Sequence, residues 1–342
     1  MAGNFHMVKI LSIDGGGIRG IIPAIVLNEI EYRLRRAGKG RPLANIFNLI
    51  AGTSTGALIA LSLTLPETVS ASAAQRTETE GRRAAMSSAA IVRLYERHGR
   101  EIFPHFHRGW TVQAVRYKYP PLGLKRVLGE TFGAATLKDA LTNLLVTSFD
   151  TERMEPHCLK NRPSRSEWKD DLNFYMRDVA WAATAAPTYF PPAHVRPVPP
   201  NGKVYCLVDG GLFAGNPAML AYVEATKIHP DQNEFLILSL GTGIDCTGYR
   251  YDEIQGWGYL EWMNPAKGFP LAAMMSAGQS EAVNHQLRRM TGVRYVRLNA
   301  PLDGASQQLD DARPRNIEAL KAVAARIIAD NRRTIDALCE LL

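Results

Sequence analysis

Short apolar runs of strand length alternate along the chain with longer segments in which apolar residues recur every three or four positions. The strand-like runs are residues 8–13, 46–51, 144–149, 204–208 and 235–240. The helix-like segments are residues 21–34, 57–65, 87–98, 179–192, 280–290 and 316–342. Strands that alternate with helices in this way predict an α/β fold with a mostly parallel central sheet. No linker or internal repeat interrupts the pattern.

The stretch between the second strand and its helix carries the first candidate for chemistry. It reads Gly52-Thr53-Ser54-Thr55-Gly56. This Gly-x-Ser-x-Gly pattern is typical of a nucleophile elbow, in which a serine stands at the tip of a sharp turn from strand to helix. Gly52 and Gly56 leave room for that turn. The helix N-terminus that follows Ser54 favours negative charge at its hydroxyl.

Two other interpretations of this stretch stay open from the pattern alone. Residues 42–66 are uncharged and long enough to span a bilayer, and Gly52-x-x-x-Gly56 fits a membrane helix-packing motif. Asn45 and Asn48 would be poorly placed in lipid, which argues against that span. The stretch also fits an ordinary tight turn with an incidental serine.

The first strand ends in a glycine loop. Residues 14–20 read Asp14-Gly15-Gly16-Gly17-Ile18-Arg19-Gly20. Gly15-x-Gly17-x-x-Gly20 matches the dinucleotide-binding fingerprint, which also needs an acidic residue after a second strand about twenty residues on. Residues 34–43 offer only basic side chains and no strand, but a dinucleotide-binding module without hydrolase activity remains the alternative function. The other interpretation is that consecutive glycine N–H groups form a cradle for an oxyanion, which acyl transfer through a serine requires.

A serine nucleophile needs a group that takes its proton. The fourth predicted strand ends in Asp209, followed by Gly210 and Gly211, and catalytic groups of α/β sheets gather at such strand ends. A carboxylate is normally a weak base, but partial burial raises its pKa. His229 and His285 fit the order of an α/β-hydrolase triad. However, His229 precedes a proline in a polar turn and His285 lies in a predicted helix.

Asp14 is a rival base, since it also follows a strand and precedes glycines. Because it opens the glycine loop, we expect it to brace that loop instead. His105-x-His107 lacks other obvious ligands, so we predict no metal site there.

Composition and charge narrow the class of protein only slightly. The 342 residues are 46% hydrophobic and 21% charged, as in soluble globular proteins, with net charge +7 and a pI of about 9.2. This excess is compatible with anionic membrane surfaces or phosphate-bearing ligands, but no basic block is dense enough for a nucleic-acid polymer.

The scattered Cys158, Cys206, Cys246 and Cys339 predict reduced thiols in a cytoplasmic protein. Residues 1–9 lack the features of a signal peptide.

Together these motifs resemble the patatin-like phospholipase family. The resemblance rests on three blocks in order, Asp14-Gly15-Gly16-Gly17-Ile18-Arg19-Gly20, Gly52-Thr53-Ser54-Thr55-Gly56 and Asp209-Gly210-Gly211. Residues 182–192 (Ala-Ala-Thr-Ala-Ala-Pro-Thr-Tyr-Phe-Pro-Pro) and 239–243 (Ser-Leu-Gly-Thr-Gly) add support. The blocks cover most of the chain, from residue 8 to residue 243. Each block alone is weak, but all three in order with these neighbours are highly specific.

The resemblance implies a three-layer α/β/α fold and hydrolysis of acyl esters of phospholipids or lysophospholipids, without a metal or other cofactor. By motif, Ser54 is the nucleophile and Asp209 is the base of a dyad that contains no histidine. The N–H groups of Gly16 and Gly17 form the oxyanion hole, with Gly15 nearby.

The resemblance also implies supporting roles around these groups. Arg19 is expected to stabilise the glycine loop or to contact the substrate phosphate. Gly52, Gly56, Gly210 and Gly211 are expected to allow close packing at the two turns.

Partners, boundaries and regulation follow as further expectations. We expect residues 8–300 to form the patatin-like domain, with 301–342 as a helical segment packed on it. The substrate implies peripheral contact with a membrane, placed at the inner membrane of a bacterial cell, and a homodimer is compatible with the sequence. Some bacterial members resemble anti-phage effectors that cyclic nucleotides activate, which implies a nucleotide activator here. Residues 67–86 are expected to form a mobile surface loop, and the aromatic, basic residues 103–119 to pack against the fold.

Overall fold

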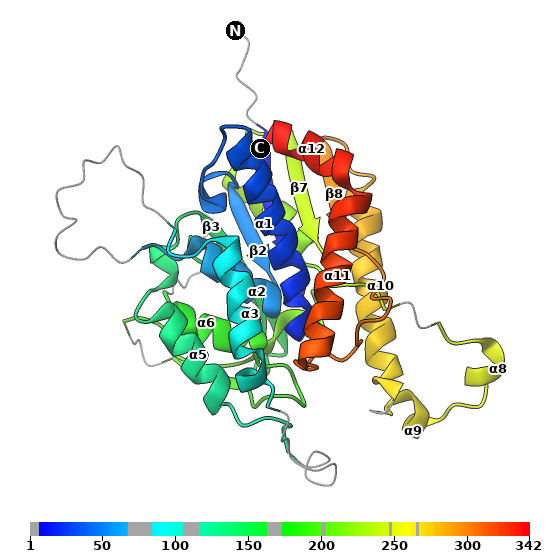
Figure 1. Cartoon of the computed structure of the whole chain (residues 1–342). Helices are drawn as coiled ribbons and strands as arrows, with labels where there is room; N and C mark the ends of the chain where they lie inside the picture. Colours follow the sequence, from blue (N-terminus) through cyan, green and yellow to red (C-terminus); the bar gives the residue numbers. More distant parts are fainter. Residues whose placement is uncertain are drawn as a thin grey trace.

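An eight-stranded sheet forms the centre of the fold (Figure 1). The computed structural model describes residues 7–67, 84–104, 116–162, 173–199, 203–245, 248–264 and 267–342. The sheet has the spatial order β5-β6-β3-β2-β1-β7-β8, with β4 paired to β3. Its strands are β1 (Val8–Ile13), β2 (Leu49–Gly52), β3 (Asn143–Asp150), β4 (Glu155–Lys160), β5 (Ala193–Val195), β6 (Tyr205–Asp209), β7 (Phe235–Leu240) and β8 (Val293–Leu298).

Five of the described strands form a parallel core, and the others are antiparallel. β3, β2, β1, β7 and β8 each run parallel to their neighbours in that order. This core confirms the predicted mostly parallel sheet. The antiparallel part, in which β4 and β6 pair with β3 and β5 pairs with β6, was not predicted. β3 and β4 are joined by a short turn, and such a turn can connect only antiparallel strands.

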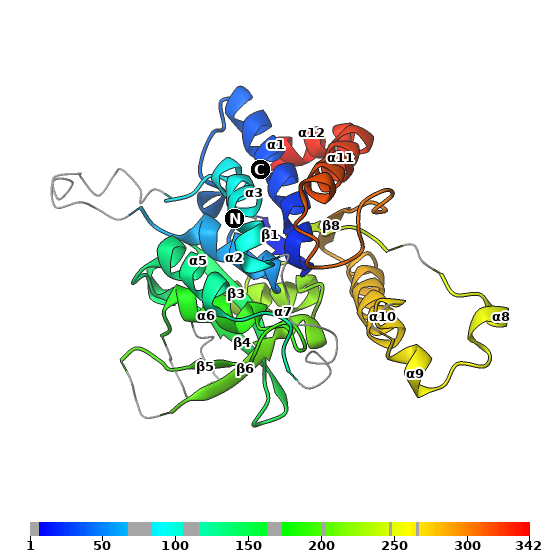
Figure 2. The ribbon, with the colours of Figure 1, turned by 60° about the horizontal axis from the view of Figure 1, so that its bottom comes forward.

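Helices cover both faces of the sheet, which confirms the three-layer α/β/α fold (Figure 2). Alternate residues of β1 divide between two hydrophobic clusters, with Val8 and Ile10 in one and Leu11 and Ile13 in the other. The longer helices are α1 (Ile21–Arg36), α2 (Thr55–Thr64), α3 (Ser88–Ile102), α5 (Leu122–Phe132), α6 (Met176–Thr184), α7 (Ala218–Ile228), α10 (Pro270–Leu287), α11 (Pro314–Asp330) and α12 (Arg332–Leu341). Two one-turn helices, α8 (Tyr251–Ile254) and α9 (Tyr259–Trp262), precede α10.

The predicted strands and helices lie close to their expected positions. β1 and β7 have the predicted bounds, whereas β2 begins three residues later and ends one residue later than predicted. The helix predicted over 280–290 begins ten residues earlier and ends three residues earlier, as α10. The helix predicted over 179–192 ends at Thr184, because the prolines that follow cannot continue it. The segment 316–342 divides into α11 and α12 at Asn331.

The membrane-span interpretation of residues 42–66 is wrong. This segment folds as strand β2, a sharp turn and the ten-residue helix α2, all in the interior of the domain. None of the helices in the described part of the chain is long and apolar enough to cross a bilayer.

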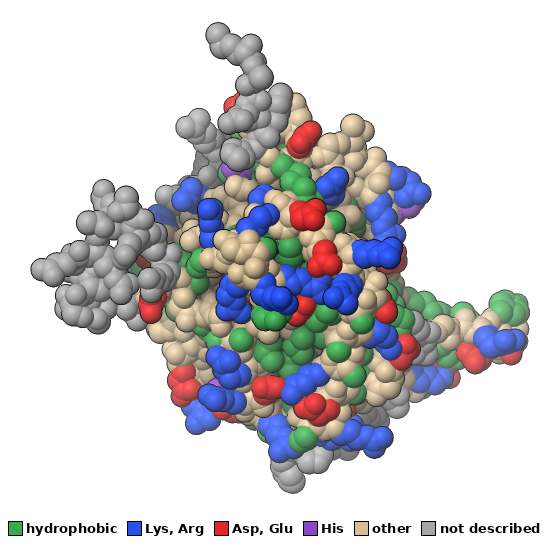
Figure 3. Space-filling view, turned by 45° about the horizontal axis from the view of Figure 1, so that its top comes forward, with side chains coloured by type: hydrophobic (Ala, Val, Ile, Leu, Met, Phe, Trp, Pro, Cys, Tyr) green, Lys and Arg blue, Asp and Glu red, His purple; other side chains and the backbone are tan. Residues whose placement is uncertain are grey.

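The C-terminal helices pack on α1, where many of the basic side chains also gather (Figure 3). Arg33 binds Glu29 of its own helix and Asp336 of α12, at 2.7 and 2.8 Å. Lys39 donates to the carbonyl groups of Cys339 and Glu340, at the negative end of the α12 dipole. Part of the positive charge of the chain therefore stabilises this helix end.

Several predictions lie outside the described residues. They are most of the 67–86 loop, the His105-x-His107 pair and Cys246. The described cysteines, Cys158, Cys206 and Cys339, are free thiols.

Candidate active site

Ser54 lies at the N-cap of α2, directly after β2, as the elbow pattern predicts. Its backbone has φ 53° and ψ −121°, which an L-residue rarely adopts. A side chain at position 52 would overlap the carbonyl of Gly56, and one at position 56 would overlap the carbonyl of Ile13. Glycine at both positions therefore lets the turn close tightly enough to hold the serine in this conformation.

The end of β6 meets the end of β2 along one edge of β3. Gly52 pairs with Val146 of β3, and Asp209 pairs with Ser148 of the same strand. β4 occupies the opposite edge, because it pairs with the β3 residues that β2 and β6 also contact. β2 runs parallel to β3 and β6 runs antiparallel, so their carboxyl ends point toward each other. This arrangement brings Asp209 next to the serine turn.

The Ser54 hydroxyl lies beside the Asp209 carboxylate, close enough to lower the pKa of that carboxylate as a hydrogen-bond donor. Asp209 is only 5% exposed, and this burial raises its pKa to about 6 against the opposing effects of hydrogen bonds from Ser54 and the Gly211 amide. The Gly211 N–H donates to Oδ1 at 2.8 Å. The two residues predicted as nucleophile and base are thus neighbours in the fold.

Close packing beneath this pair fixes the two turns relative to each other. A side chain at Gly210 would overlap Thr147 of β3. The Thr53 and Thr147 hydroxyl oxygens lie 2.7 Å apart, and the Thr53 hydroxyl oxygen lies 2.5 Å from the Ala214 carbonyl oxygen to which it donates. Thr53 therefore connects the serine turn both to β3 and to the loop that follows Asp209.

The glycine loop after β1 packs directly against Ser54. A Cβ at Gly15 would lie 3.2 Å from the Cβ of Ser54, so only glycine leaves this contact unstrained. The Gly15 N–H donates to the Gly215 carbonyl at 3.0 Å and is engaged there. The N–H groups of Gly16 and Gly17 have no acceptor in the described part of the chain. Neither amide is thus occupied by an acceptor from the described residues.

The loop is also supported from the end of β7. A side chain at Gly16 would overlap Thr242, whose hydroxyl donates to the Gly15 carbonyl at 2.6 Å. Gly17 has φ 57°, and a side chain there would overlap the Leu309 carbonyl. The sequence indicates Thr242 only as part of the 239–243 motif, because its contact with the glycine loop requires the parallel pairing of β7 with β1.

Asp14 is bound to Arg297 and not to the serine. The guanidinium donates to both carboxylate oxygens, at 2.9 and 2.5 Å, and also to the Ser239 hydroxyl at 2.8 Å. Both side chains are almost fully buried. Both carboxylate oxygens are engaged by the guanidinium, so the pair braces the loop. Arg297 lies in β8, which was not predicted, and its position between apolar residues was the only available signal.

Arg19 lies beside the loop and donates through Nε to the Gly16 carbonyl at 3.3 Å. Burial lowers the pKa of its guanidinium, while Asp245, Tyr189 and Asp14 oppose that effect. The contact fits the expected role in stabilising the loop. Contact with a substrate phosphate stays a prediction.

The two histidines considered as bases lie elsewhere. His229 follows the end of α7, and His285 lies in the last turn of α10, where its Nδ1 is 3.0 Å from Arg289. In the described residues, no group of three His, Cys, Asp or Glu side chains could hold a metal ion.

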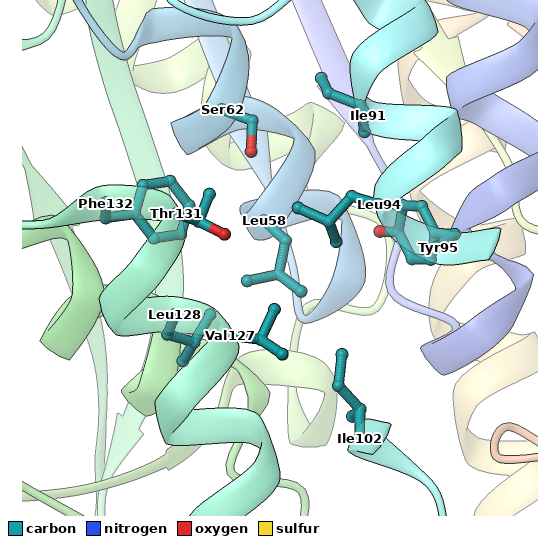
Figure 4. A pocket seen from close by; sticks show the side chains of 10 residues that line it. All are labelled: Leu58, Ser62, Ile91, Leu94, Tyr95, Ile102, Val127, Leu128, Thr131 and Phe132. Carbon is teal, nitrogen blue, oxygen red and sulfur yellow. The ribbon is translucent and has the colours of Figure 1, made fainter. Parts of the chain in front are cut away.

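A small apolar cavity lies between α2, α3 and α5 (Figure 4). Leu58 and Ser62 line it from α2, one and two turns beyond Ser54, and Tyr95 lines it from α3. Tyr95 also hydrogen-bonds the Thr55 hydroxyl. The cavity offers about 10 Å³ to the centre of a water molecule, which is at the limit for holding one water. As it stands, this space supports the packing of α2 and does not hold an acyl chain.

The three-layer fold with a serine at a strand–helix turn is the architecture of serine acyl hydrolases. A model of the patatin-like phospholipase family matches residues 11–222. The chain belongs to this family, as its motifs predicted. Lipid hydrolysis is the activity that the family assignment supports.

Plant relatives match the chain along nearly its whole length. Patatin-like protein 2 of Arabidopsis thaliana is 32% identical over 364 residues, which cover 95% of this chain and 86% of that protein. Patatin-04/09 of Solanum tuberosum is 33% identical over 352 residues, which cover 94% and 84%. The crystal structure of VipD from Legionella pneumophila aligns with a TM-score of 0.35 and 13% identity, over 95% of this chain and 67% of that one. That likeness is too weak to add to the assignment.

The dinucleotide fingerprint lacks its second part. Residues 33–36 form the last turn of α1, and the next strand, β2, ends in Gly52 and not in an acidic residue. The glycine loop instead contacts Ser54, Thr242 and Leu309.

Proposed function

We propose that the protein is a serine acyl hydrolase of phospholipids or lysophospholipids that uses Ser54 and Asp209 as a catalytic dyad. The observation that carries the proposal is the position of Ser54 beside the buried Asp209 carboxylate, where the ends of β2 and β6 meet on β3; burial raises the pKa of this carboxylate to about 6. A carboxylate with that pKa is still mostly ionised at neutral pH, and it accepts a proton more readily than an ordinary aspartate.

The reaction follows from these positions. The Ser54 oxygen attacks the ester carbonyl carbon while its proton moves to Asp209. The carbonyl oxygen becomes negatively charged and accepts hydrogen bonds from the Gly16 and Gly17 amides. The C–O bond to the alcohol then breaks, and the alcohol leaves with the proton from Asp209. Water attacks the acyl-enzyme by the same route, gives its proton to Asp209, and releases the fatty acid as Ser54 regains a proton.

The elbow supports this proposal electrostatically. Ser54 stands at the N-terminus of α2, where unpaired amides and the helix dipole stabilise negative charge. Arg19, held against the carbonyl of Gly16, adds a positive charge beside the loop. A phospholipid substrate brings both an ester carbonyl and a phosphate to such a site.

The test is fatty-acid release from phospholipid vesicles and labelling by a fluorophosphonate. Ser54→Ala should abolish both, and Asp209→Asn should lower the rate of release by about a thousandfold or more, the scale of losing one member of a catalytic unit. His229→Ala and His285→Ala are matched controls that should keep the wild-type rate. A fully active Asp209→Asn protein would exclude Asp209 as the base of a catalytic dyad.

The same assay distinguishes the remaining alternatives. If the protein were a dinucleotide-binding module, the Ser54→Ala variant would still bind a dinucleotide. The fluorophosphonate would then not label Ser54 of the wild-type protein. Activation by a cyclic nucleotide stays a prediction of the sequence resemblance, so the rates are measured with and without a panel of cyclic dinucleotides. Equal rates across the panel would exclude that form of control for the compounds tested.

A further inference from the structure

Exposed apolar side chains gather on one projection of the fold, which we call the apolar arm. It comprises α8, α9 and the first half of α10, residues 248–264 and 267–278. Its exposed large apolar side chains are Tyr251, Tyr259, Leu260, Met263, Leu271, Met274 and Met275. Leu260 is 79% exposed and Met275 is 64% exposed. A monomeric protein in water rarely leaves so many large apolar side chains together on its surface.

The first half of α10 departs from the pattern of a surface helix. All of residues 271–278 are exposed, and residues 268–280 contain no charged side chain. A helix at a protein surface normally turns an apolar stripe to the core and a charged face to water. After Pro270, which is buried at its start, α10 has buried residues only in its second half, at Asn284 and Leu287. The first half is therefore built to be covered by something outside the described chain.

The apolar arm projects beside the candidate active site. In Figures 1 and 2, α9 and the start of α10 extend at the end of the molecule toward which β7 points, the end that carries the glycine loop. Gln279 of α10 accepts a hydrogen bond from the Gly215 N–H at 2.9 Å and donates to the Phe213 carbonyl. Gly215 in turn accepts the bond from Gly15. The residue that follows the arm in α10 is thus connected through Gly215 to the glycine loop.

The chemistry of the arm is that of a bilayer interface. Its aromatic residues include Trp257 and Trp262, whose rings pack 5.2 Å apart, and Lys267 lies 4.3 Å above the Trp257 ring. Tryptophan and tyrosine are enriched where proteins meet the headgroup region, and long basic side chains reach from there to water. Leucine and methionine supply the surface that enters the acyl region.

We propose that the apolar arm inserts into the surface of a lipid bilayer and thereby holds the mouth of the active site against the membrane. The inference rests on the proposed function, because it requires a substrate that resides in that bilayer. Leu212 and Ile244, which follow Asp209 and the Gly241–Gly243 turn in the chain, are exposed apolar residues as well. A second copy of the chain on this surface would cover the entrance to the site, whereas a bilayer would deliver substrate to it.

The charges of the arm specify the kind of membrane. Arg250 and Lys267 are balanced by Asp252, Glu253 and Glu261. Basic groups gather instead at the end of α1, whose last turn carries Arg33, Arg35 and Arg36. Binding therefore depends on apolar insertion and needs no anionic lipid.

Vesicle flotation tests the proposal, using the full chain with Ser54→Ala so that lipid is not consumed. The protein should float with phosphatidylcholine vesicles, equally at low salt and in about 0.5 M NaCl, where surface charges are screened. Leu260→Asp and Met275→Asp should each lower the bound fraction by about tenfold, because a charge replaces an inserted side chain. Tyr32→Asp, on α1 and 48% exposed, is the control and should float as the parent does.

Soluble-substrate activity separates failure of this proposal from failure of the proposed function. With Ser54 intact, Leu260→Asp and Met275→Asp should keep hydrolysis of a short water-soluble nitrophenyl ester while losing hydrolysis of vesicle lipid. Unchanged flotation of both variants would overturn the proposal that the apolar arm inserts into the bilayer, whatever the result of the enzyme assay. A dimer in sedimentation equilibrium that Leu260→Asp dissociates would also overturn it, by showing that a second copy covers the surface.

Discussion

Asp209 lies opposite Ser148 on β3, just beyond the point where the same edge of β3 pairs with the end of β2. One strand thereby aligns the serine turn and the carboxylate, which are far apart in the sequence. The Asp209 side chain is buried in this position, and burial raises its pKa. That shift links stability and activity to pH in opposite directions.

Asp209→Asn should stabilise the fold at neutral pH. The folded-state pKa of about 6 lies above the value of an unfolded aspartate, so the ionised carboxylate opposes folding at every pH above about 4. Removing the charge should raise the free energy of unfolding by about 1–3 kcal/mol at pH 7.5, and this gain should vanish near pH 4. Urea unfolding at the two pH values measures it. Equal effects of the substitution at both pH values would contradict a raised pKa for Asp209 in the folded protein.

Activity should require the ionised form of Asp209. As pH falls through about 6, the carboxylate gains a proton and can no longer accept the one from Ser54. We therefore expect kcat/KM on a soluble ester to fall by about tenfold for each pH unit below 6. Circular dichroism over the same range confirms that the protein remains folded. A constant kcat/KM down to pH 5 would be inconsistent with Asp209 as the base.

Ser54→Gly should be more stable than Ser54→Ala, although both variants lack the hydroxyl. Position 54 has φ 53° and ψ −121°, a conformation that strains alanine as it strains serine but suits glycine. We expect a difference of about 1 kcal/mol in the free energy of unfolding, seen by urea denaturation. If the alanine variant were the more stable one, the backbone at the elbow would not be strained.

Arg297→Met should strongly destabilise the protein, because it leaves the buried Asp14 carboxylate unpaired. The expected loss is about 3–5 kcal/mol in the free energy of unfolding. Adding Asp14→Asn should recover part of that loss, since no unpaired charge then remains. The double-mutant cycle in urea measures the coupling. Additive losses would show that the pair does not act as a unit.

Much of the parallel core could be predicted, because its strands and helices differ clearly in apolar periodicity. Ser54, Asp209 and the glycine loop were also accessible, since each occupies the end of a predicted strand. The glycines at positions 52 and 56 are explained by backbone contacts that any residue with a side chain would disturb. Such positions have a strong local signature.

The long-range contacts that connect these motifs cannot be recognised from a local sequence pattern. Thr53 reaches Thr147 and Ala214, and Arg297 reaches Asp14, only after distant strands have paired. β8 contains partly exposed polar residues, so its sequence gives a weak strand pattern. The antiparallel return of β4 depends on the turn after β3, and β6 reaches β3 only after α6 and β5. Apolar periodicity does not encode the direction of either strand.

The order of these contacts along the chain has a consequence for biosynthesis. The serine turn leaves the ribosome early, whereas its carboxylate partner and then the arginine that braces the glycine loop follow much later. Domains fold as their segments become available. A nascent chain that ends before β6 therefore carries an exposed serine without a proton acceptor, so hydrolytic competence cannot arise before β6 has been synthesised.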